Sequence, residues 1–254
     1  MRLDQYLTER GYFDSRSKSA HAVKKGLVSV NGKVCEKVSK DVFDGDEITV
    51  SDEVFFVSRG GFKLNKALEE FDVDLTDKVF ADVGASTGGF TDCLLRYGVR
   101  KVFAVDVGKG LLDEKLKTDR RVIVMDETNA RYISKRDFPD KIDGITADCS
   151  FISLKLLLPV FSDILDEKGD LFVLVKPQFE CGKNNIPKSG IIKDSVLRAR
   201  VCSDVLSDAE TYGFRTLAIS KAPEFKDKNV EYVVYLKKTG KAMTKDEITD
   251  FFKR

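Results

Sequence analysis

The sequence has few of the features that mark metalloproteins and general polyanion binders. It contains one histidine, His21, and five cysteines without a C-x-x-C pair, so the ligand spacing of a zinc or iron–sulfur site is absent. An odd number of cysteines suits a reducing compartment. The formal net charge is only +1, which excludes a uniformly basic nucleic-acid binder. We therefore expect no metal, and any contact with a polyanion must come from a local basic patch.

Long apolar runs are also missing. The richest stretch, residues 152–164, is broken by two charged residues and a proline, whereas a membrane-spanning helix needs about 20 apolar residues. Asp4 and Glu9 stand where a signal peptide would have its apolar core. The sequence therefore predicts a cytoplasmic protein that neither crosses a membrane nor is exported by that route.

The chain is long enough for more than one folding unit. At about 150 residues per domain, 254 residues correspond to one large domain or to an ordinary domain with a small one. Residues 1–50 have their own pattern: two short helices, the second over residues 17–25, precede an Asn31-Gly32 hairpin turn and a strand at residues 45–50. This order predicts a small α+β domain.

Several motifs of this first segment are similar to those of a known RNA-binding domain. The runs RLDQYL at residues 2–7, VSVNG at residues 28–32 and GDEI at residues 45–48 resemble the S4 domain. The resemblance implies docking of structured RNA on the face that carries the second helix. Independently, only Asp14 is acidic between residues 10 and 25. The residues predicted to contact RNA phosphates are Arg10, Arg16, Lys18, Lys24 and Lys25. The alternative is an ordinary solvated amphipathic helix.

After a connector at residues 51–58, the pattern changes to alternating strands and helices over residues 59–238. Strand-like runs are found at residues 79–83, 101–105, 121–125, 141–147, 170–175, 214–219 and 230–236. Short apolar runs that alternate with amphipathic helices predict an α/β fold with a doubly wound parallel sheet. The last two runs have no clear helix between them, so we expect a terminal antiparallel hairpin. This is the strand pattern of class I methyltransferases. The tail, residues 239–254, has a capping-box pattern typical of a helix.

The first of these strands leads into the glycine-rich run DVGASTGGFT at residues 82–91, which predicts a ligand-binding loop. Ser86 replaces the second glycine of a dinucleotide fingerprint, and the run lacks the lysine of a Walker A motif. Its spacing is similar to the S-adenosyl-L-methionine motif, with Asp106 expected to accept the ribose hydroxyls and Asp126 to lie beside the adenine. The predicted cofactor-binding residues are Asp82, Gly84, Ala85, Ser86, Thr87, Gly88, Phe90, Asp106 and Asp126. The alternative for the glycines is turn geometry alone.

Four charged residues fall at or beside the expected rim of the sheet: Lys63, Asp148, Lys176 and Glu231. Asp148 and Lys176 each end an apolar strand, where an unpaired charge is costly, so their positions favour a functional role. The structural alternative is a pair of salt bridges at strand ends.

These four residues, in this order and on this fold, resemble the Lys-Asp-Lys-Glu tetrad of FtsJ-type ribose 2′-O-methyltransferases. The runs SRGGFKL at residues 58–64, ADCSFISL at residues 147–154 and VKPQFE at residues 175–180, behind an S4-like segment, are similar to the TlyA family. Membership implies methylation of cytidine 2′-hydroxyls in ribosomal RNA, with ribosomal RNA or ribosomal subunits as partners. Lys176 is the candidate general base. Lys63 and Glu231 would position the sugar, and Asp148 would orient Lys176 or the cofactor.

Three other interpretations stay open at this point. Cys149 would be the nucleophile of a carbon-5 base methyltransferase, although a thiol among apolar neighbours is usually inert. The older haemolysin label of the TlyA family suggests a secreted membrane-lytic protein. A third alternative is an RNA-binding assembly factor that keeps the cofactor fold without turnover.

Overall fold

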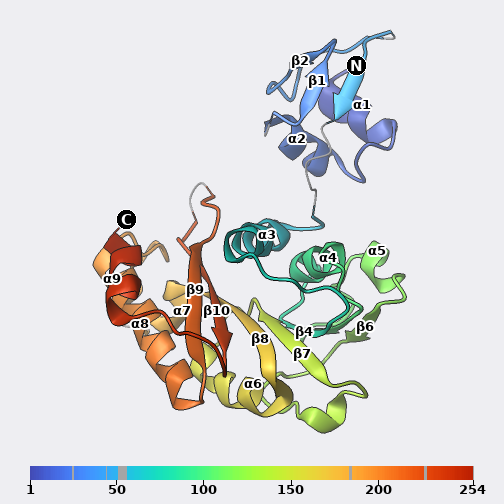
Figure 1. The fold of residues 1–254 in the computed structure, drawn as a ribbon. Helices are drawn as coiled ribbons and strands as arrows, with labels where there is room; N and C mark the ends of the chain where they lie inside the picture. The colour runs from blue at the N-terminus through green and yellow to red at the C-terminus, as the bar shows by residue number, and fades with distance from the viewer. Residues whose placement is uncertain (25, 44, 51–55, 183–184, 226–227, 254) are drawn as a thin grey trace. The chain divides into compact units, whose positions relative to one another are not determined.

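The computed structural model describes residues 1–24, 26–43, 45–50, 56–182, 185–225 and 228–253 (Figure 1). The chain divides into two compact units, Met1–Phe55 and Phe56–Arg254. Each unit has its own apolar core. Among the described residues, no helix combines the length and apolar character needed to cross a bilayer.

The first unit consists of two helices and a three-stranded antiparallel sheet with the order β2-β1-β3. Its elements are α1 (Leu3–Glu9), α2 (Arg16–Lys24), β1 (Val28–Val30), β2 (Lys33–Val34) and β3 (Ile48–Val50). Asn31 and Gly32 both have positive φ angles, which fit the tight turn between β1 and β2. Leu3, Leu7 and Val23 of the two helices are fully buried against the sheet residues. The sequence pattern of two helices, a hairpin and a strand is therefore the observed one.

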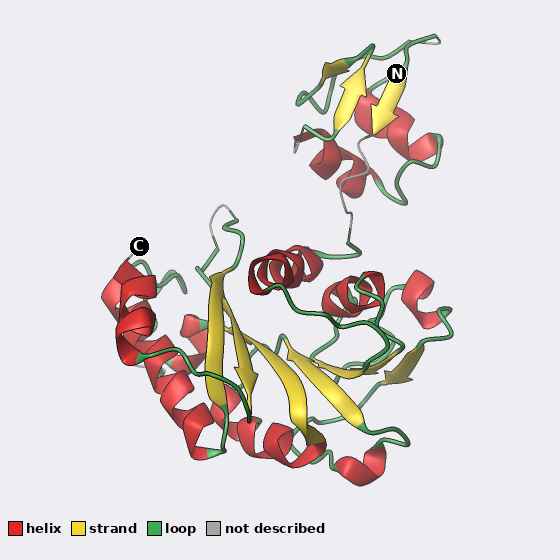
Figure 2. Ribbon diagram, in the orientation of Figure 1, coloured by secondary structure: helices red, strands yellow, loops and turns green. Residues whose placement is uncertain are grey.

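The second unit is built on a seven-stranded sheet with the order β6-β5-β4-β7-β8-β10-β9. Figure 2 shows the strands of this sheet in yellow among the red helices. The strands are β4 (Val79–Val83), β5 (Lys101–Val105), β6 (Val122–Met125), β7 (Ile142–Ala147), β8 (Leu165–Val175), β9 (Arg215–Lys221) and β10 (Tyr232–Lys237). Strands β4 to β8 pair in parallel, and β10 pairs antiparallel with both β8 and β9. The predicted doubly wound sheet with a terminal antiparallel hairpin is confirmed.

Helices cover both faces of this sheet (Figure 1). One face packs against α3 (Arg59–Phe71), α4 (Gly89–Arg96) and α5 (Glu114–Lys117), and the other packs against α6 (Leu158–Ile164) and α8 (Ser195–Thr211). Side chains of successive strand residues point to opposite faces of the sheet. In β4, Phe80 packs in the core with α3, α4 and α5, and Ala81 packs in the core with α6 and α8. Shorter elements are η1 (Lys135–Asp137), η2 (Leu154–Leu156) and α7 (Pro177–Glu180).

The tail forms α9 (Lys245–Lys253), which begins with reciprocal capping bonds. The backbone N–H of Thr244 donates to Glu247 Oε2 at 2.6 Å, and the N–H of Glu247 donates to Thr244 Oγ1 at 3.2 Å. Phe251 and Phe252 then pack edge-on against the ring of Tyr232 in β10. The helix thus continues the apolar core on one side of the sheet.

Strand ends position the functional residues. Neighbouring strands β5, β4, β7 and β8 are parallel, so their carboxyl ends meet at one edge. Asp106, Gly84, Asp148 and Lys176 are the residues that directly follow these four strands. The antiparallel register pairs Tyr232 with Val175, which brings Glu231, just before β10, to the same edge. Ligands of doubly wound folds bind at this edge.

Candidate active site

Two positions in the loop after β4 have a backbone conformation that favours glycine. Gly84 has φ +80°, and a Cβ atom there would lie 2.9 Å from the carbonyl oxygen of Asp148. Gly88 has φ +94° and begins α4, where a Cβ atom would overlap the Leu116 side chain. The first glycine therefore opens space at the edge of the sheet, and the second allows α4 to pack against α5.

Asp106 presents a fixed carboxylate beside this loop. Its Oδ2 accepts from the backbone N–H of Ser86 at 2.8 Å, and its Oδ1 accepts from the N–H of Gly108 at 2.8 Å. Each oxygen keeps a further lone pair for a ligand. The sequence prediction of a ribose acceptor therefore has the geometry that such a role needs.

A cavity of about 720 Å³ lies over this carboxylate. Gly84, Ser86 and Asp106 form its polar side, and Val107, Leu111, Phe151 and Leu156 are among its apolar residues. Thr128, Asn129 and Ala130, which follow β6, complete the wall. A flat apolar group flanked by hydrogen-bonding groups, such as a nucleoside, matches this lining.

Three of the predicted cofactor residues lie elsewhere. Asp82 is fully buried and is absent from the walls of the three cavities at this edge of the sheet, and Gly88 packs against α5. Asp126 accepts from the backbone N–H of Gly110 at 2.7 Å and is also absent from the cavity walls described. These residues shape the loops around the site. Ala85, Thr87 and Phe90 do line a smaller cavity of about 170 Å³ that joins the larger one at Gly84 and Ser86.

Asp82 is held beneath the loop by two threonines. Thr91 Oγ1 donates to its Oδ2 at 2.6 Å, and Thr146 Oγ1 donates to its Oδ1 at 2.8 Å. Burial nevertheless raises the pKa of Asp82 to about 6, because the desolvation of its charged form outweighs these bonds. A carboxyl group with a raised pKa stabilises the fold most in its protonated form.

Because of Asp82, we expect the free energy of unfolding to fall as the pH rises from about 4 to about 6. A raise from 3.8 to about 6 corresponds to about 3 kcal/mol, which is fully present below pH 4 and lost as the pH rises through 6. Asp82→Asn cannot ionise and should lack this loss. Urea unfolding of both proteins from pH 4 to pH 8 measures it. A difference between the two free energies of unfolding that does not change with pH would contradict the prediction.

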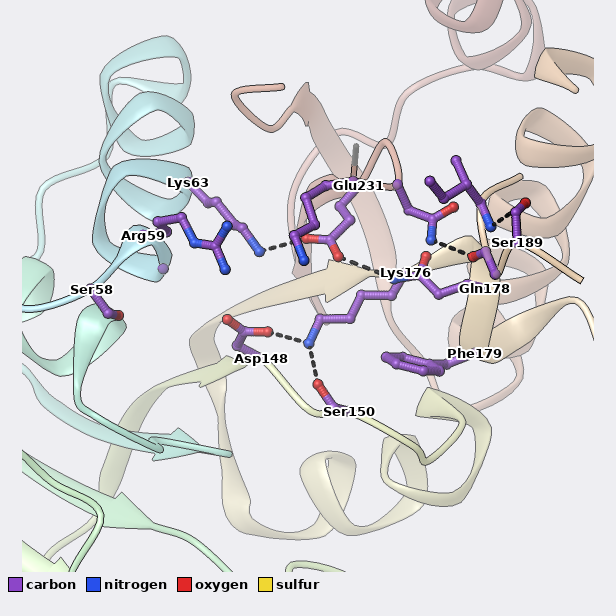
Figure 3. A pocket seen from close by; sticks show the side chains of 15 residues that line it. Ser58, Arg59, Lys63, Asp148, Ser150, Lys176, Gln178, Phe179, Ser189 and Glu231 are labelled. Carbon is purple, nitrogen blue, oxygen red and sulfur yellow. Dashed lines mark hydrogen bonds and ion pairs between the residues drawn. The ribbon is translucent and has the colours of Figure 1, made fainter. Parts of the chain in front are cut away.

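The four charged rim residues form two ion pairs at the end of the sheet (Figure 3). Lys176 Nζ lies 2.6 Å from Asp148 Oδ1. Lys63 Nζ, on α3, lies 2.6 Å from Glu231 Oε2. All four side chains are at least three-quarters buried, so these are not solvated surface salt bridges.

The tetrad lies on the wall of a cavity of about 580 Å³. This cavity shares Ser58, Gly60, Lys63 and Lys176 with the 170 Å³ cavity, which in turn shares Gly84 and Ser86 with the cavity over Asp106. Asp148 and Ser150 line all three. The cavity over Asp106 and the cavity at the lysine therefore lie next to each other.

Sequence reasoning missed four residues of this site. Ser150 Oγ accepts from Lys176 Nζ at 2.8 Å, and Gln178 Nε2 donates to Glu231 Oε1 at 3.2 Å. Phe151 is 91% exposed, has φ +64°, and its ring centroid lies 5.0 Å from that of Phe179. The sequence did contain a signal for these two phenylalanines. Phe151 stands three residues after Asp148, and Phe179 stands three residues after Lys176.

The alternative nucleophile, Cys149, is not poised for reaction. Its thiol donates to the carbonyl oxygen of Val83, and burial raises its pKa to about 12. A thiolate is the reactive form of cysteine, and this environment disfavours it. Among the described residues, no three metal-binding side chains cluster as a metal site either.

In the first unit, Asp4 joins two arginines. Asp4 Oδ1 lies 3.0 Å from Arg2 Nε and its Oδ2 lies 2.8 Å from an Arg16 guanidinium nitrogen. The hydrogen bond from Arg2 contributes most to lowering the pKa of the buried Asp4 carboxyl to about 2. Both arginines are about half exposed, so Arg16 stands beside a second basic residue that sequence reasoning missed.

The other predicted RNA contacts lie on the same unit. Lys18 Nζ pairs with Asp14 at 2.8 Å, the Arg10 guanidinium lies 5.4 Å from the Tyr6 ring centre, and Lys24 is exposed. Lys25 lies outside the described residues. Exposed cations therefore occur along α2, at its start and at its end.

Comparisons with known proteins place both units in families. The FtsJ-like methyltransferase family matches residues 56–238, and the S4 domain matches residues 1–48. Hemolysin A of Brachyspira hyodysenteriae is 41% identical to this chain, and the match covers 92% of this chain and 99% of Hemolysin A. The 16S/23S rRNA (cytidine-2'-O)-methyltransferase TlyA of Mycobacterium tuberculosis is 37% identical and covers 98% of this chain and 94% of its own.

A solved structure is equally similar. The protein named "Putative hemolysin" from Streptococcus thermophilus has a TM-score of 0.74 and 36% identity, covering 100% of this chain and 94% of its own. These matches confirm the predicted enzyme class and its methyl donor, S-adenosyl-L-methionine. The chain belongs to the TlyA family of FtsJ-like methyltransferases that carry an S4 domain.

Proposed function

We propose that this protein methylates the ribose 2′-hydroxyl of cytidine in ribosomal RNA. The observation that carries the proposal is that the cavity over Asp106 shares wall residues with the cavities around the buried pairs Lys176–Asp148 and Lys63–Glu231. Relatives from Mycobacterium tuberculosis and Campylobacter jejuni are named as rRNA (cytidine-2'-O)-methyltransferases. Ribosomal RNA as substrate also implies that the protein acts in the cytoplasm.

The cavity over Asp106 fits the methyl donor. Asp106 would accept the ribose hydroxyls of the cofactor, and Gly84 leaves room for a ligand where any side chain would meet Asp148. Leu111 and Ala130 would contact the adenine, since they supply apolar surface to the same cavity. When bound, S-adenosyl-L-methionine supplies a methyl group on a positively charged sulfur.

Lys176 is the proposed general base. A neutral amine has two N–H bonds and one lone pair. Ser150 Oγ accepts one N–H bond at 2.8 Å, and Asp148 Oδ1 lies 2.6 Å from Nζ. The lone pair is then left to take the proton from the ribose 2′-oxygen. Asp148 and Ser150 thus orient the amine from two sides.

Lys63 and Glu231 are proposed to position the sugar. Glu231 Oε2 accepts from Lys63 and its Oε1 accepts from Gln178, so the carboxylate is fixed between α3 and α7. A ribose hydroxyl that donates to this carboxylate would be held without moving it. Precise positioning is a large part of catalysis when the nucleophile is weak.

The proposed division of the chain gives RNA docking to residues 1–50 and methyl transfer to residues 59–238, with residues 51–58 as a connector. Deleting residues 1–55, the first unit, should leave the affinity for S-adenosyl-L-methionine unchanged, because Gly84, Asp106 and the strands before them lie downstream. RNA affinity should fall strongly. Calorimetry with the cofactor and filter binding with ribosomal RNA measure the two effects.

Within the intact protein, Arg16→Gln combined with Lys24→Gln should weaken RNA binding and reduce its salt dependence. Two lost phosphate contacts lower the log–log slope by about one to two units. Lys241→Gln with Lys245→Gln, two exposed lysines of the tail, is the control for net charge. Equal slopes for the two double variants would contradict RNA docking on α2.

The proposed reaction is tested on ribosomal RNA from cells that lack this enzyme. Incubation with labelled S-adenosyl-L-methionine, followed by nuclease digestion and mass spectrometry, should reveal 2′-O-methylcytidine. A methyl group on a base would contradict the proposal. Stable binding of RNA and cofactor without turnover would favour the assembly factor, and lysis of vesicles without methyl transfer would favour a membrane-lytic protein.

A further inference from the structure

The 580 Å³ cavity contains two cationic side chains that the transfer of the methyl group does not use. Arg59, the first residue of α3, and Lys228, which precedes β10, both line this cavity and are exposed. Phe225 connects them, because the Arg59 guanidinium lies 5.4 Å from its ring centre and its carbonyl accepts from the Lys228 backbone N–H at 3.2 Å. Figure 3 shows Arg59 on the same helix as Lys63.

The charges of the cavity wall do not balance. Four cationic side chains, Arg59, Lys63, Lys176 and Lys228, line it together with two anionic ones, Asp148 and Glu231. The two carboxylates are already paired with Lys63 and Lys176. Within the described part of the chain, Arg59 and Lys228 have no ion pair. The wall therefore carries an excess of positive charge beside the tetrad, which attracts an anion.

The position of Arg59 has a cost in stability. Its charge lies in the first turn of a 13-residue helix that has no acidic residue in that turn, and a cation at a helix N-terminus opposes the helix dipole. Asn229 fixes the neighbouring wall, since its Nδ2 donates to Gly190 O at 2.8 Å and its Oδ1 accepts from the Ile192 N–H at 2.8 Å. The cations are thus held beside a rigid wall.

The substrate proposed above brings the matching charge. In RNA the 2′-oxygen is on the carbon next to the one that carries the 3′-phosphodiester, so a ribose at the tetrad places a phosphate a few bonds away. We propose that Arg59 and Lys228 form a subsite for the phosphodiester on the 3′ side of the methylated ribose. This inference rests on the proposed function. Guanidinium binds phosphate through paired hydrogen bonds, and ammonium binds it as a point charge.

The test combines side-chain and phosphate changes. Arg59→Gln, Lys228→Gln and the double variant are compared on an RNA fragment that the wild type methylates, with either a native or an uncharged methylphosphonate linkage 3′ of the target. We expect the methylphosphonate to reduce kcat/KM of the wild type about ten- to hundredfold. On native RNA, kcat/KM of the double variant should be lower than that of the wild type by the same factor. On the methylphosphonate RNA, kcat/KM of the double variant should not fall further.

Two controls make the result specific. Arg100 and Lys141 directly precede β5 and β7, at the edge of the sheet opposite to the site. Arg100→Gln with Lys141→Gln removes the same number of positive charges, and this variant should respond to the methylphosphonate like the wild type. Arg59→Gln should not destabilise α3. If the methylphosphonate reduced kcat/KM of the double variant by the same factor as that of the wild type, the two changes would act independently. That result would overturn the subsite. If the wild type methylates no ribose, the proposed function fails, and affinities for the two RNAs then test the subsite alone.

Discussion

Replacing Lys176 with alanine should lower the single-turnover rate of methyl transfer by about 10² to 10⁴-fold. The affinity for S-adenosyl-L-methionine should stay near that of the wild type, because Lys176 does not line the cavity over Asp106. Lys176→Arg should be almost as slow, since a guanidinium keeps the positive charge but has no lone pair to accept a proton.

The controls separate a base from a charge. Cys149→Ala removes the neighbouring thiol and should retain the wild-type rate, as expected for a cysteine whose thiolate is disfavoured. Restoration of most activity by arginine would mean that Lys176 acts through its charge and not as a base. A large loss in Cys149→Ala alone would favour covalent chemistry on a base.

The positions of Asp148 and Lys176 at the ends of β7 and β8 were predictable, and charges that end apolar strands need partners. Their pairing with each other was not, since it depends on the order of strands in the sheet. The adjacency of β7 and β8 brings the two residues together, and the antiparallel register of β10 adds Glu231. A sequence shows where each strand ends, whereas hydrogen-bonded neighbours are chosen by the packing of the whole sheet.

Asp82 and Asp126 have partners in the structure that reasoning by motif does not show. Contact of both with the cofactor stays a prediction, whereas the structure shows that the Asp82 carboxylate accepts from Thr91 and Thr146 and that of Asp126 accepts from Gly110. Side-chain direction after the last strand residue depends on local turns that no periodicity reports. The exposed ring of Phe151 was missed for the same reason, because its positive φ is a property of the turn.

Asp106→Ala should raise the dissociation constant for S-adenosyl-L-methionine about ten- to hundredfold. The carboxylate is fixed by the N–H groups of Ser86 and Gly108, so it meets a ribose without reorganisation. One charge-assisted hydrogen bond that competes with water contributes a net effect of about 1.5 to 3 kcal/mol, which corresponds to this change. Isothermal calorimetry measures the change directly.

Asp126→Ala is the matched control for this prediction. It removes a neighbouring carboxylate that accepts a hydrogen bond from Gly110 but is not among the residues that line the cavity over Asp106. Its effect on affinity should therefore be much smaller than that of Asp106→Ala, arising only through the loop that carries Leu111. Equal losses in the two variants would mean that Asp126 contacts the adenine after all, and unchanged affinity in Asp106→Ala would place the cofactor ribose away from β5.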